Sequence, residues 1–573
     1  MRVQESTGGG RIAFALLFLS FAALSGCAFL RDFDEFSFKS GDAGDGAPTD
    51  CVPSPEVCNG IDDDCNGLID DEPLACALPN ASETVCLAGS CALVSCEPDH
   101  DDCFDRVPGC ETRIRDSHAH CGRCHSPCGP SEVCDEGKCR LVRARWGAFL
   151  HGPAAVLWGA AGDDLLLSFP SSGSHTVIGS TGEETARTVQ VGTEHFVYRL
   201  GPDGRFSEPF ILQSFESKIQ ITAMTGDSAG NVYLVGSYAE PVLPLRPEYI
   251  LPVPAEGRVY AFIIALSPDM KARWARAFVG SSSKELFAVK LSPTGKIIVG
   301  GRFTEDLVFL EHDYSGDADQ GLFAALLAKN GDSIDAFALM NDAAPLGGFA
   351  LAVDPLGQSY VSRLTNGHFT VGDRLYDGER RRVIAALDSN LELLWSRALV
   401  EASAIETYGL SIDAGPNGDL LVATGSTLEL SWGGEALEPG AHLARLLGNA
   451  GGKHLWSRSF PDVARLLHPR IHRDGHGYVM GDLSGATLPD LGGGPLSVPS
   501  VPDTLIASFD SEGRYRWGKV MGGAGDEKVA HLAVHPSGDI TSVGSHTASF
   551  TLDEIEVPFS APGRWYHIFR FSE

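Results

Sequence analysis

GNVYLVGS, from Gly230 to Ser237, is the stretch that decides the fold of this chain. It consists of a turn glycine followed by a short apolar run, which is the pattern of a strand that follows a tight turn. Related stretches recur 57 to 65 residues apart. They are GSHTVIGS from Gly173, GKIIVGGR from Gly295, GQSYVSRL from Gly357, GDLLVATG from Gly418, GHGYVMGD from Gly475 and GDITSVGS from Gly538. A repeat of this length indicates seven similar structural units.

Each unit contains further strands. Most of the glycine strands follow another strand across a Pro/Gly turn, and a third and a fourth strand come later in the unit. The fourth strand often carries a tryptophan, as in FIIALSPDMKARWARAF (262–278), VIAALDSNLELLWSRAL (383–399) and LIASFDSEGRYRWGKVM (505–521). Four strands per unit, repeated seven times, predict an all-β fold, a seven-bladed β-propeller over residues 141–573.

The two ends of this region predict how the ring closes. The last unit reaches HIFRFSE (567–573) directly after its third strand. VRARWGAFL (142–150) aligns with the fourth-strand stretch ARWARAFVG (272–280), so that Trp146 takes the place of Trp274. We therefore expect the first strand of the propeller to pair with the last one. Such pairing removes an exposed sheet edge that would otherwise invite aggregation.

These units resemble the SBBP-type β-propeller repeats of secreted bacterial proteins. Their third and fourth strands are also similar to those of quinoprotein propellers. The resemblance spans residues 141–573 and implies an architecture, not a particular chemistry.

The propeller sequence predicts no catalysis. Residues 226–230 match the pattern GxSxG, but a nucleophile elbow needs a helix after the serine and a strand follows here, so we expect Ser228 to be a turn residue. The tryptophans that recur on fourth strands are expected to pack between blades; they are Trp274, Trp395, Trp456 and Trp517. A quinone-type cofactor needs a charge-lined central pocket, and the sequence does not indicate which residues would form one. The scattered His and Asp residues show no shared position across the units.

The N-terminus predicts export. Arg2 and Arg11 precede the apolar run IAFALLFLSFAAL (12–24), which is short for a membrane span and typical of a signal peptide. LSGC (24–27) resembles the lipobox of bacterial lipoproteins. The resemblance implies a signal peptide over 1–26 and lipid attachment to Cys27. The stretch KSGDAGDGAPTD (39–50) has almost nothing to bury, which predicts a flexible tether over 27–50. By the sorting rules of that family, Ala28 favours an outer-membrane lipoprotein, periplasmic or surface-exposed.

The cysteines define a separate module. All 15 cysteines lie between Cys27 and Cys139. Without Cys27 an even number remains, and in an exported segment dense, even cysteine indicates a disulfide framework. We therefore predict a small disulfide-rich module over residues 51–140, whose pairing the spacing leaves open.

A calcium-like loop lies in this module, within EVCNGIDDDCNGLIDDE (56–72). Oxygens for a hard cation are expected from six positions, with Gly67 providing the sharp turn and Ile69 pointing inward. The expected ligands are Asp62, Asp64, Asn66, the carbonyl of Leu68, Asp70 and Glu72. Position 12 of the loop is Pro73, so Glu72 or Asp71 would have to close the site and its end departs from an EF-hand. The string resembles the MopE-type metal-binding motif; the family name suggests copper, but oxygen ligands suit calcium better. A solvated acidic turn is the alternative.

Residues 109–139 resemble a short Cys repeat of secreted bacterial proteins, with the pattern GCE, CGxCxxxC and CxxGxC. The same stretch contains Cys121-Gly-Arg-Cys124-His125, which also fits a c-type haem attachment motif. The Cys repeat already explains both cysteines, so haem is the minor alternative and calcium the expected cofactor.

Charge and composition limit the partners. The 573 residues carry a net charge of −31, which speaks against a nucleic-acid partner and leaves membrane attachment to the lipid. The leading hypothesis is a lipid-anchored extracytoplasmic binding or scaffold protein that presents the propeller to a protein or glycan. A quinoprotein-like or c-type haem redox protein is one alternative. A structural envelope lipoprotein without a specific ligand is the other.

Overall fold

The structure is a computed structural model. It describes residues 52–71, 76–104, 106–152, 156–171, 173–189, 193–214, 218–242, 251–279, 283–309, 312–341, 347–365, 369–372, 374–376, 381–400, 410–483, 489–497, 503–559 and 564–573. Over these ranges the regular elements are β-strands, apart from the 3-10 turn η1 (Gly448–Ala450). No helix in these ranges is long and apolar enough to cross a membrane. The chain divides into an N-terminal unit, Met1–Ala75 with Ala88–Ser90, and a propeller unit, Cys76–Leu87 with Cys91–Glu573.

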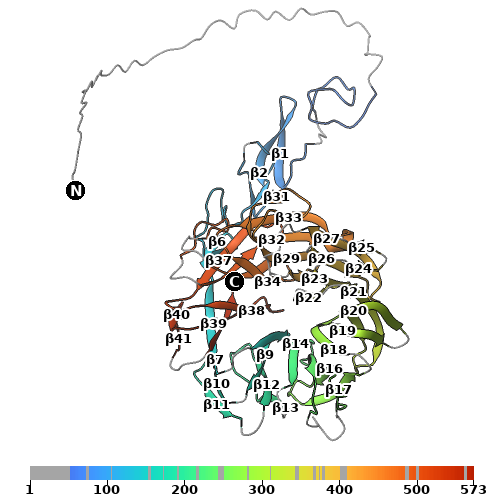
Figure 1. The fold of residues 1–573 in the computed structure, drawn as a ribbon. Helices are drawn as coiled ribbons and strands as arrows, with labels where there is room; N and C mark the ends of the chain where they lie inside the picture. The colour runs from blue at the N-terminus through green and yellow to red at the C-terminus, as the bar shows by residue number, and fades with distance from the viewer. Residues whose placement is uncertain are drawn as a thin grey trace, which may run out of the picture. The chain divides into compact units, whose positions relative to one another are not determined.

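The propeller unit contains seven antiparallel blades, each with four principal strands (Figure 1). Blade 1 consists of β8 (Leu157–Ala161), β9 (Asp164–Ser171), β12 (Thr193–Leu200) and β13 (Phe210–Ser214). Blade 2 consists of β14 (Ile219–Gly226), β15 (Val232–Tyr238), β16 (Tyr260–Leu266) and β17 (Ala272–Phe278). Blade 3 consists of β18 (Lys284–Leu291), β19 (Ile297–Phe309), β20 (His312–Leu327) and β21 (Ser333–Asn341). Blade 4 consists of β22 (Gly347–Val353), β23 (Ser359–Thr365), β26 (Arg381–Leu387) and β27 (Leu393–Val400).

The remaining blades follow the same order. Blade 5 consists of β28 (Ser411–Ala414), β29 (Asp419–Ser426), β32 (Gly440–Leu447) and β33 (Lys453–Phe460). Blade 6 consists of β34 (Arg465–Ile471), β35 (Gly477–Asp482), β36 (Thr504–Phe509) and β37 (Tyr515–Met521). Blade 7 consists of β38 (Lys528–Val534), β39 (Ile540–His546), β42 (Trp565–Ser572) and β7 (Arg143–His151). Four short hairpin pairs complete the unit: β10 (Ser174–Ile178) with β11 (Glu184–Thr188), β24 (Phe369–Val371) with β25 (Arg374–Tyr376), β30 (Leu430–Ser431) with β31 (Ala436–Leu437), and β40 (Phe550–Leu552) with β41 (Ile555–Val557).

The first strands of the blades form an inner ring. They contact one another in the cyclic order β8, β14, β18, β22, β28, β34, β38 and back to β8. The second strands are covered on both faces by the neighbouring sheets. β15, which contains most of the stretch Gly230–Ser237, is buried along its whole length. A strand covered on both faces is apolar throughout instead of alternating, which explains the continuous run VYLVGSY. The predicted all-β, seven-bladed propeller is confirmed.

Ring closure also follows the prediction. β42 pairs antiparallel with β7 from Trp565 opposite His151 to Ser572 opposite Arg143. One detail of the sequence interpretation was wrong. The stretch from Gly173 is not the second strand of blade 1; its strand β10 pairs with β7 at the outer edge of blade 7, and β9 provides the second strand of blade 1. Two turn-and-strand patterns lie close together in this part of the sequence, and periodicity alone selected the wrong one.

Two recurring types of side-chain hydrogen bond connect neighbouring blades. The indole N–H of a fourth-strand tryptophan donates to a carbonyl in the turn after the third strand of the following blade, at 2.6–3.1 Å. The pairs are Trp146 with Pro202, Trp274 with Lys329, Trp395 with Gly448, and Trp456 with Ser511. These tryptophans therefore pack between blades, as the sequence predicted.

The second recurring bond comes from an arginine on the third strand. In blades 1, 5 and 7 it pairs with the aspartate that begins the second strand or the turn before it, and its guanidinium also donates to a turn carbonyl of the next blade. The sets are Arg199 with Asp164 and Gly230, Arg445 with Asp419 and Gly475, and Arg570 with Asp539 and Asp163. Both types of bond fix the angle between adjacent sheets.

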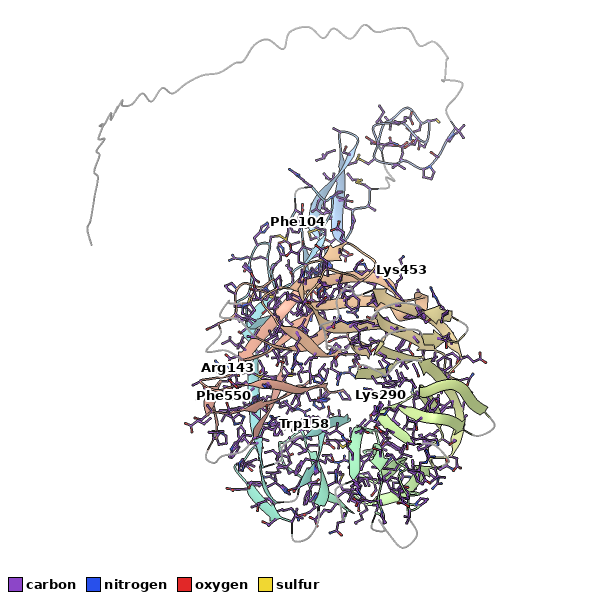
Figure 2. All side chains as sticks on the ribbon, in the orientation of Figure 1. Phe104, Arg143, Trp158, Lys290, Lys453 and Phe550 are labelled. Atoms are coloured by element: carbon purple, nitrogen blue, oxygen red, sulfur yellow. A yellow bond between two sulfur atoms is a disulfide. The ribbon has the colours of Figure 1, made fainter. Side chains whose placement is uncertain are left out.

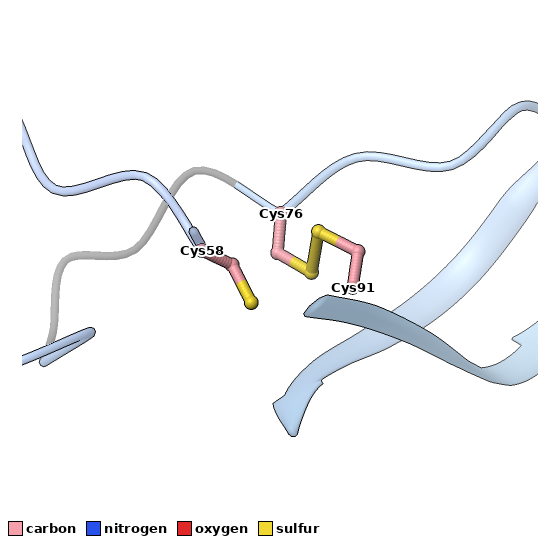
Figure 3. A group of neighbouring side chains, drawn as sticks. All are labelled: Cys58, Cys76 and Cys91. Carbon is pink, nitrogen blue, oxygen red and sulfur yellow. A yellow bond between two sulfur atoms is a disulfide. The ribbon is translucent and has the colours of Figure 1, made fainter. Parts of the chain in front are cut away.

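The cysteine-rich residues from 76 to 141 contain three small hairpins, β1 (Ala81–Leu87) with β2 (Ser90–Cys96), β3 (His100–Asp101) with β4 (Thr112–Arg113), and β5 (Glu132–Asp135) with β6 (Lys138–Leu141). Disulfides join them: Cys76–Cys91 (Figure 3), Cys96–Cys110, Cys103–Cys124, Cys121–Cys134 and Cys128–Cys139. Part of this region packs on blade 6, where the His118 ring lies 5.1 Å from the Tyr515 ring. Cys58, Cys65 and Cys86 are also disulfide-bonded. The expected disulfide framework is present.

Candidate functional site

Three carboxylates converge in the N-terminal unit. Oxygens of Glu56, Asp64 and Asp71 all lie within 4.8 Å of one another. Glu56 is 2% exposed, and its Oε1 accepts hydrogen bonds from the backbone N–H groups of Asp63 and Asp64 at 2.7 and 2.8 Å. Its Oε2 is buried and has no hydrogen-bond partner among the described residues. A buried, unpaired carboxylate oxygen beside two further carboxylates is costly unless a cation neutralises it.

The residues predicted as calcium ligands are placed in different ways. Asp62 accepts hydrogen bonds from the N–H groups of Asn66 at 3.1 Å and Gly67 at 2.9 Å. The Asn66 amide donates to Asp64 at 2.9 Å, and the Asp70 carboxylate accepts from the backbone of Asn59 at 2.9 Å. Among the predicted ligands that the structure describes, Asp64 is the one that belongs to the group of Glu56, Asp64 and Asp71.

The other predicted positions lie at the surface or outside the described residues. Leu68 and Ile69 are 60% and 63% exposed, so the expectation that Ile69 points inward was wrong. Glu72 and Cys27 lie outside the described residues.

Glu56 was missed because the calcium-loop template begins at Asp62, whereas Asp71 was expected, as the alternative to Glu72, to close the site. A usable signal existed: Glu56 is the one acidic residue between positions 52 and 61. The group supplies hard oxygen ligands and no described nitrogen ligand, which fits calcium better than copper or zinc.

The haem-like motif lies among disulfides. Cys121 is bonded to Cys134 and Cys124 to Cys103, and the backbone N–H of His125 donates to Nδ1 of His120 at 3.0 Å. Thioether attachment of haem consumes both cysteine sulfurs, so a haem-bearing chain would lack these two bridges.

A second cluster lies on the inner ring of the propeller. In blades 2 to 7 the first and second strands are joined by the same five-residue turn, closed by a hydrogen bond from the N–H of its first residue to the carbonyl of its fifth. Two residues before this turn lie Lys290 on β18, Asp413 on β28 and Arg470 on β34. Four residues before it lie His468 on β34 and His531 on β38. We call these five residues the axial cluster; Figure 2 labels Lys290 on the inner ring.

The sequence interpretation missed this cluster. It found no shared position for the His and Asp residues, yet the structure places Asp413 at one position of the ring with Lys290 and Arg470, and two histidines at another. These positions lie on the first strands, before the turn, whereas the sequence comparison followed each unit from the turn glycine onward. Aligning the units backward from the turn, instead of forward from the glycine, would have shown the shared positions.

The cluster has a distinctive electrostatic environment. The His468 and His531 rings lie 5.4 Å apart, and all five side chains are partly exposed within the inner ring. Burial, reinforced by the charges of Arg470 and Arg465, lowers the pKa of His468 to about 3. Burial also lowers the pKa of His531 well below its usual range, with Arg470 as the next cause. Both imidazoles are therefore neutral at pH 7 and offer N–H donors without a charge.

Ser228 of the GxSxG match lies exposed in the turn between β14 and β15, where the Asp227 carboxylate accepts from the N–H groups of Ala229 and Asn231. It occupies a turn, as expected, with a strand on either side.

No family model matches this chain, and no curated protein sequence matches it. Among solved structures, a puromycin hydrolase aligns at 14% identity over 69% of this chain with a TM-score of 0.30, and this chain spans 58% of its length. An ulvan lyase aligns at 9% identity, covering 69% of this chain and 91% of that chain, with a TM-score of 0.35. A rhamnogalacturonan lyase from Bacillus licheniformis aligns at 12% identity, covering 73% and 76%, with a TM-score of 0.25. At these values the similarities carry no information on activity.

Proposed function

We propose that this chain is a lipid-anchored extracytoplasmic binding protein that presents its propeller to a protein or glycan ligand, and that it performs no catalysis. The observation that carries the proposal is the axial cluster. A protein of net charge −31 places a lysine and an arginine together on the inner ring of its propeller, with Asp413 as the neighbouring carboxylate. Charged groups that are partly exposed on a rigid ring are arranged for a ligand better than for stability.

The N-terminal features complete the proposal. Lipid on Cys27 would attach the chain to the outer membrane, and residues 27–50 would act as a tether. Calcium held by Glu56, Asp64 and Asp71 would rigidify the N-terminal unit by neutralising their mutual repulsion. Calcium here has a structural role and supplies no reaction.

The test uses the exported, oxidised chain from residue 51 to 573, immobilised and exposed to cell-surface proteins and to a panel of acidic and neutral glycans. We expect a retained ligand that a Lys290→Met, Arg470→Met double variant does not retain. If the double variant retained the ligand as well as the unchanged chain does, the ligand would bind outside the axial cluster. Retention of nothing would favour the structural envelope lipoprotein, and turnover of a retained glycan would contradict the non-catalytic proposal.

A further inference from the structure

The axial cluster combines charges with small neighbours. At the position two residues before the turn, the blades that do not contribute a charged residue carry Thr225, Ala352 and Ala533. At the position four residues before it, the blades without histidine carry Ala223, Ala288, Ala350 and Ser411. These side chains are too short to pair with a charged group across the ring. At these two positions of blades 2 to 7, the charged residues and histidines are therefore confined to blades 3, 5, 6 and 7.

The two cations of the cluster are not neutralised by ion pairs. Neither Lys290 nor Arg470 has a carboxylate oxygen within 4.0 Å in the described part of the chain. The Arg470 Nη1 donates to the carbonyl of Pro469 at 2.8 Å. Asp413 is already engaged, because its Oδ2 accepts from the N–H of Ile471 at 3.0 Å. Two cations thus share one occupied carboxylate.

The groups that surround the histidines are also mainly basic. His531 is influenced by Arg470, His468, Lys290 and His535, and His468 by Arg470 and Arg465. Burial and the charge of Arg470 lower the pKa of Lys290, and the Asp413 carboxylate acts in the opposite direction. A site of this composition attracts negative charge, in contrast to the acidic chain around it.

We propose that the axial cluster binds an oxyanion group of the ligand, a carboxylate, sulfate or phosphate. Lys290 and Arg470 supply the opposite charges, and the N–H groups of His468 and His531 donate to the remaining oxygens. This inference rests on the proposed function for the place of the ligand and adds its chemical class.

Binding is coupled to protons. A bound anion favours the charged form of both imidazoles and so raises their pKa values toward neutrality. The complex then takes up protons that the free protein does not hold, so the affinity rises as the pH falls through the pKa values of the imidazoles in the complex.

The experiment is titration calorimetry of the chain from residue 51 to 573 with inorganic sulfate, inorganic phosphate and an oligogalacturonide. Lys290→Met and Arg470→Met are each expected to weaken binding about tenfold or more, and Lys290→Arg to retain it. Lys453→Met is the matched control, because Lys453 is exposed on the outermost strand β33 of blade 5 (Figure 2), and it is expected to bind like the unchanged chain. Near-UV circular dichroism checks that each variant keeps its packing.

The outcomes separate the sources of the anion. Binding of sulfate or phosphate alone indicates a small free anion, and much tighter binding of the oligogalacturonide indicates an acidic polysaccharide; both support the oxyanion site. Absence of heat with all three probes, or equal affinity for Lys290→Met and Lys453→Met, overturns it. A neutral glycan or protein retained in the immobilisation experiment would then leave the binding function standing without the oxyanion site.

Discussion

The indole Nε1 of Trp517 donates a hydrogen bond of 2.5 Å to the carboxylate Oε1 of Glu573. Four other fourth-strand tryptophans make the equivalent bond to a backbone carbonyl in a turn of the next blade. Blade 7 has no such turn, because its third and fourth strands, β42 and β7, come from distant parts of the sequence. A side chain replaces the missing carbonyl at this point of the ring.

The first prediction concerns this replacement. Glu573 also forms an ion pair with Arg516 at 2.8 Å, and Trp517 and Arg516 are 0% and 8% exposed. Glu573→Ala leaves a buried indole N–H and a buried guanidinium without this acceptor, so we expect a loss of about 2–4 kcal/mol in the free energy of unfolding. Glu573→Gln keeps an acceptor for the indole and should lose less. Urea unfolding followed by tryptophan fluorescence measures both; equal losses would mean that the indole bond contributes nothing.

The second prediction concerns the buried pair of Arg445 and Asp419, whose side chains are 4% and 5% exposed. Arg445→Met leaves the Asp419 charge buried without its partner. We expect it to lower the free energy of unfolding by about 3–5 kcal/mol. The double variant Asp419→Leu, Arg445→Met removes both charges and should cost less than the single one. Arg514→Met is the matched control, because Arg514 is 67% exposed in its pair with Asp510 and should change stability by about 0–1 kcal/mol. Thermal unfolding of the three variants gives the comparison; a double variant as unstable as the single one would contradict it.

The third prediction concerns pH. Glu527 and Asp503 are 1% and 0% exposed and share a side-chain hydrogen bond. Burial, reinforced by the Asp503 carboxyl, raises the pKa of Glu527 from 4.5 to about 7. Between these two values the folded chain holds a proton that the unfolded chain releases, so stability falls as the pH rises from 4.5 to 7.

The expected fall is about 3 kcal/mol, and it levels off above the folded-state pKa. Glu527→Gln should remove this part of the pH dependence and be more stable than the unchanged chain at about pH 8. Urea unfolding at a series of pH values tests it. An identical pH profile for the variant would show that Glu527 does not carry the proton.

The fold was largely predictable from the sequence, and the candidate sites were not. The turn glycines and the fourth-strand tryptophans recur because every blade needs the same turn and the same contact to its neighbour, so a repeat search finds them. Lys290 and Arg470 occur once each, at a strand position where three other units carry Thr225, Ala352 and Ala533. Glu56 lies outside the loop template that identified Asp64. The candidate sites consist of residues that differ from one unit to the next, whereas a repeat search finds only the residues that the units share.

The fourth prediction concerns the metal content of the exported, oxidised chain. Glu56 Oε2 is buried without a partner, while Asp64 and Asp71 add two further carboxylates beside it. Glu56→Gln removes one charge and keeps the size of the side chain, so we expect the calcium affinity to fall about tenfold or more. Glu83→Gln, at an exposed position of β1, is the matched control and should bind calcium like the unchanged chain.

Elemental analysis after dialysis without chelator, followed by calcium titration of each variant, makes the measurement decisive. About one calcium per chain, weakened in Glu56→Gln but not in Glu83→Gln, is the expected result. If the unchanged chain bound no calcium, the group of Glu56, Asp64 and Asp71 would be a solvated acidic turn. Stoichiometric iron would instead mean that Cys121 and Cys124 carry haem, and the bridges to Cys134 and Cys103 would then have to be absent from that protein. Because thioether attachment and these disulfides exclude each other, a thiol count on the same sample separates the two states of the module.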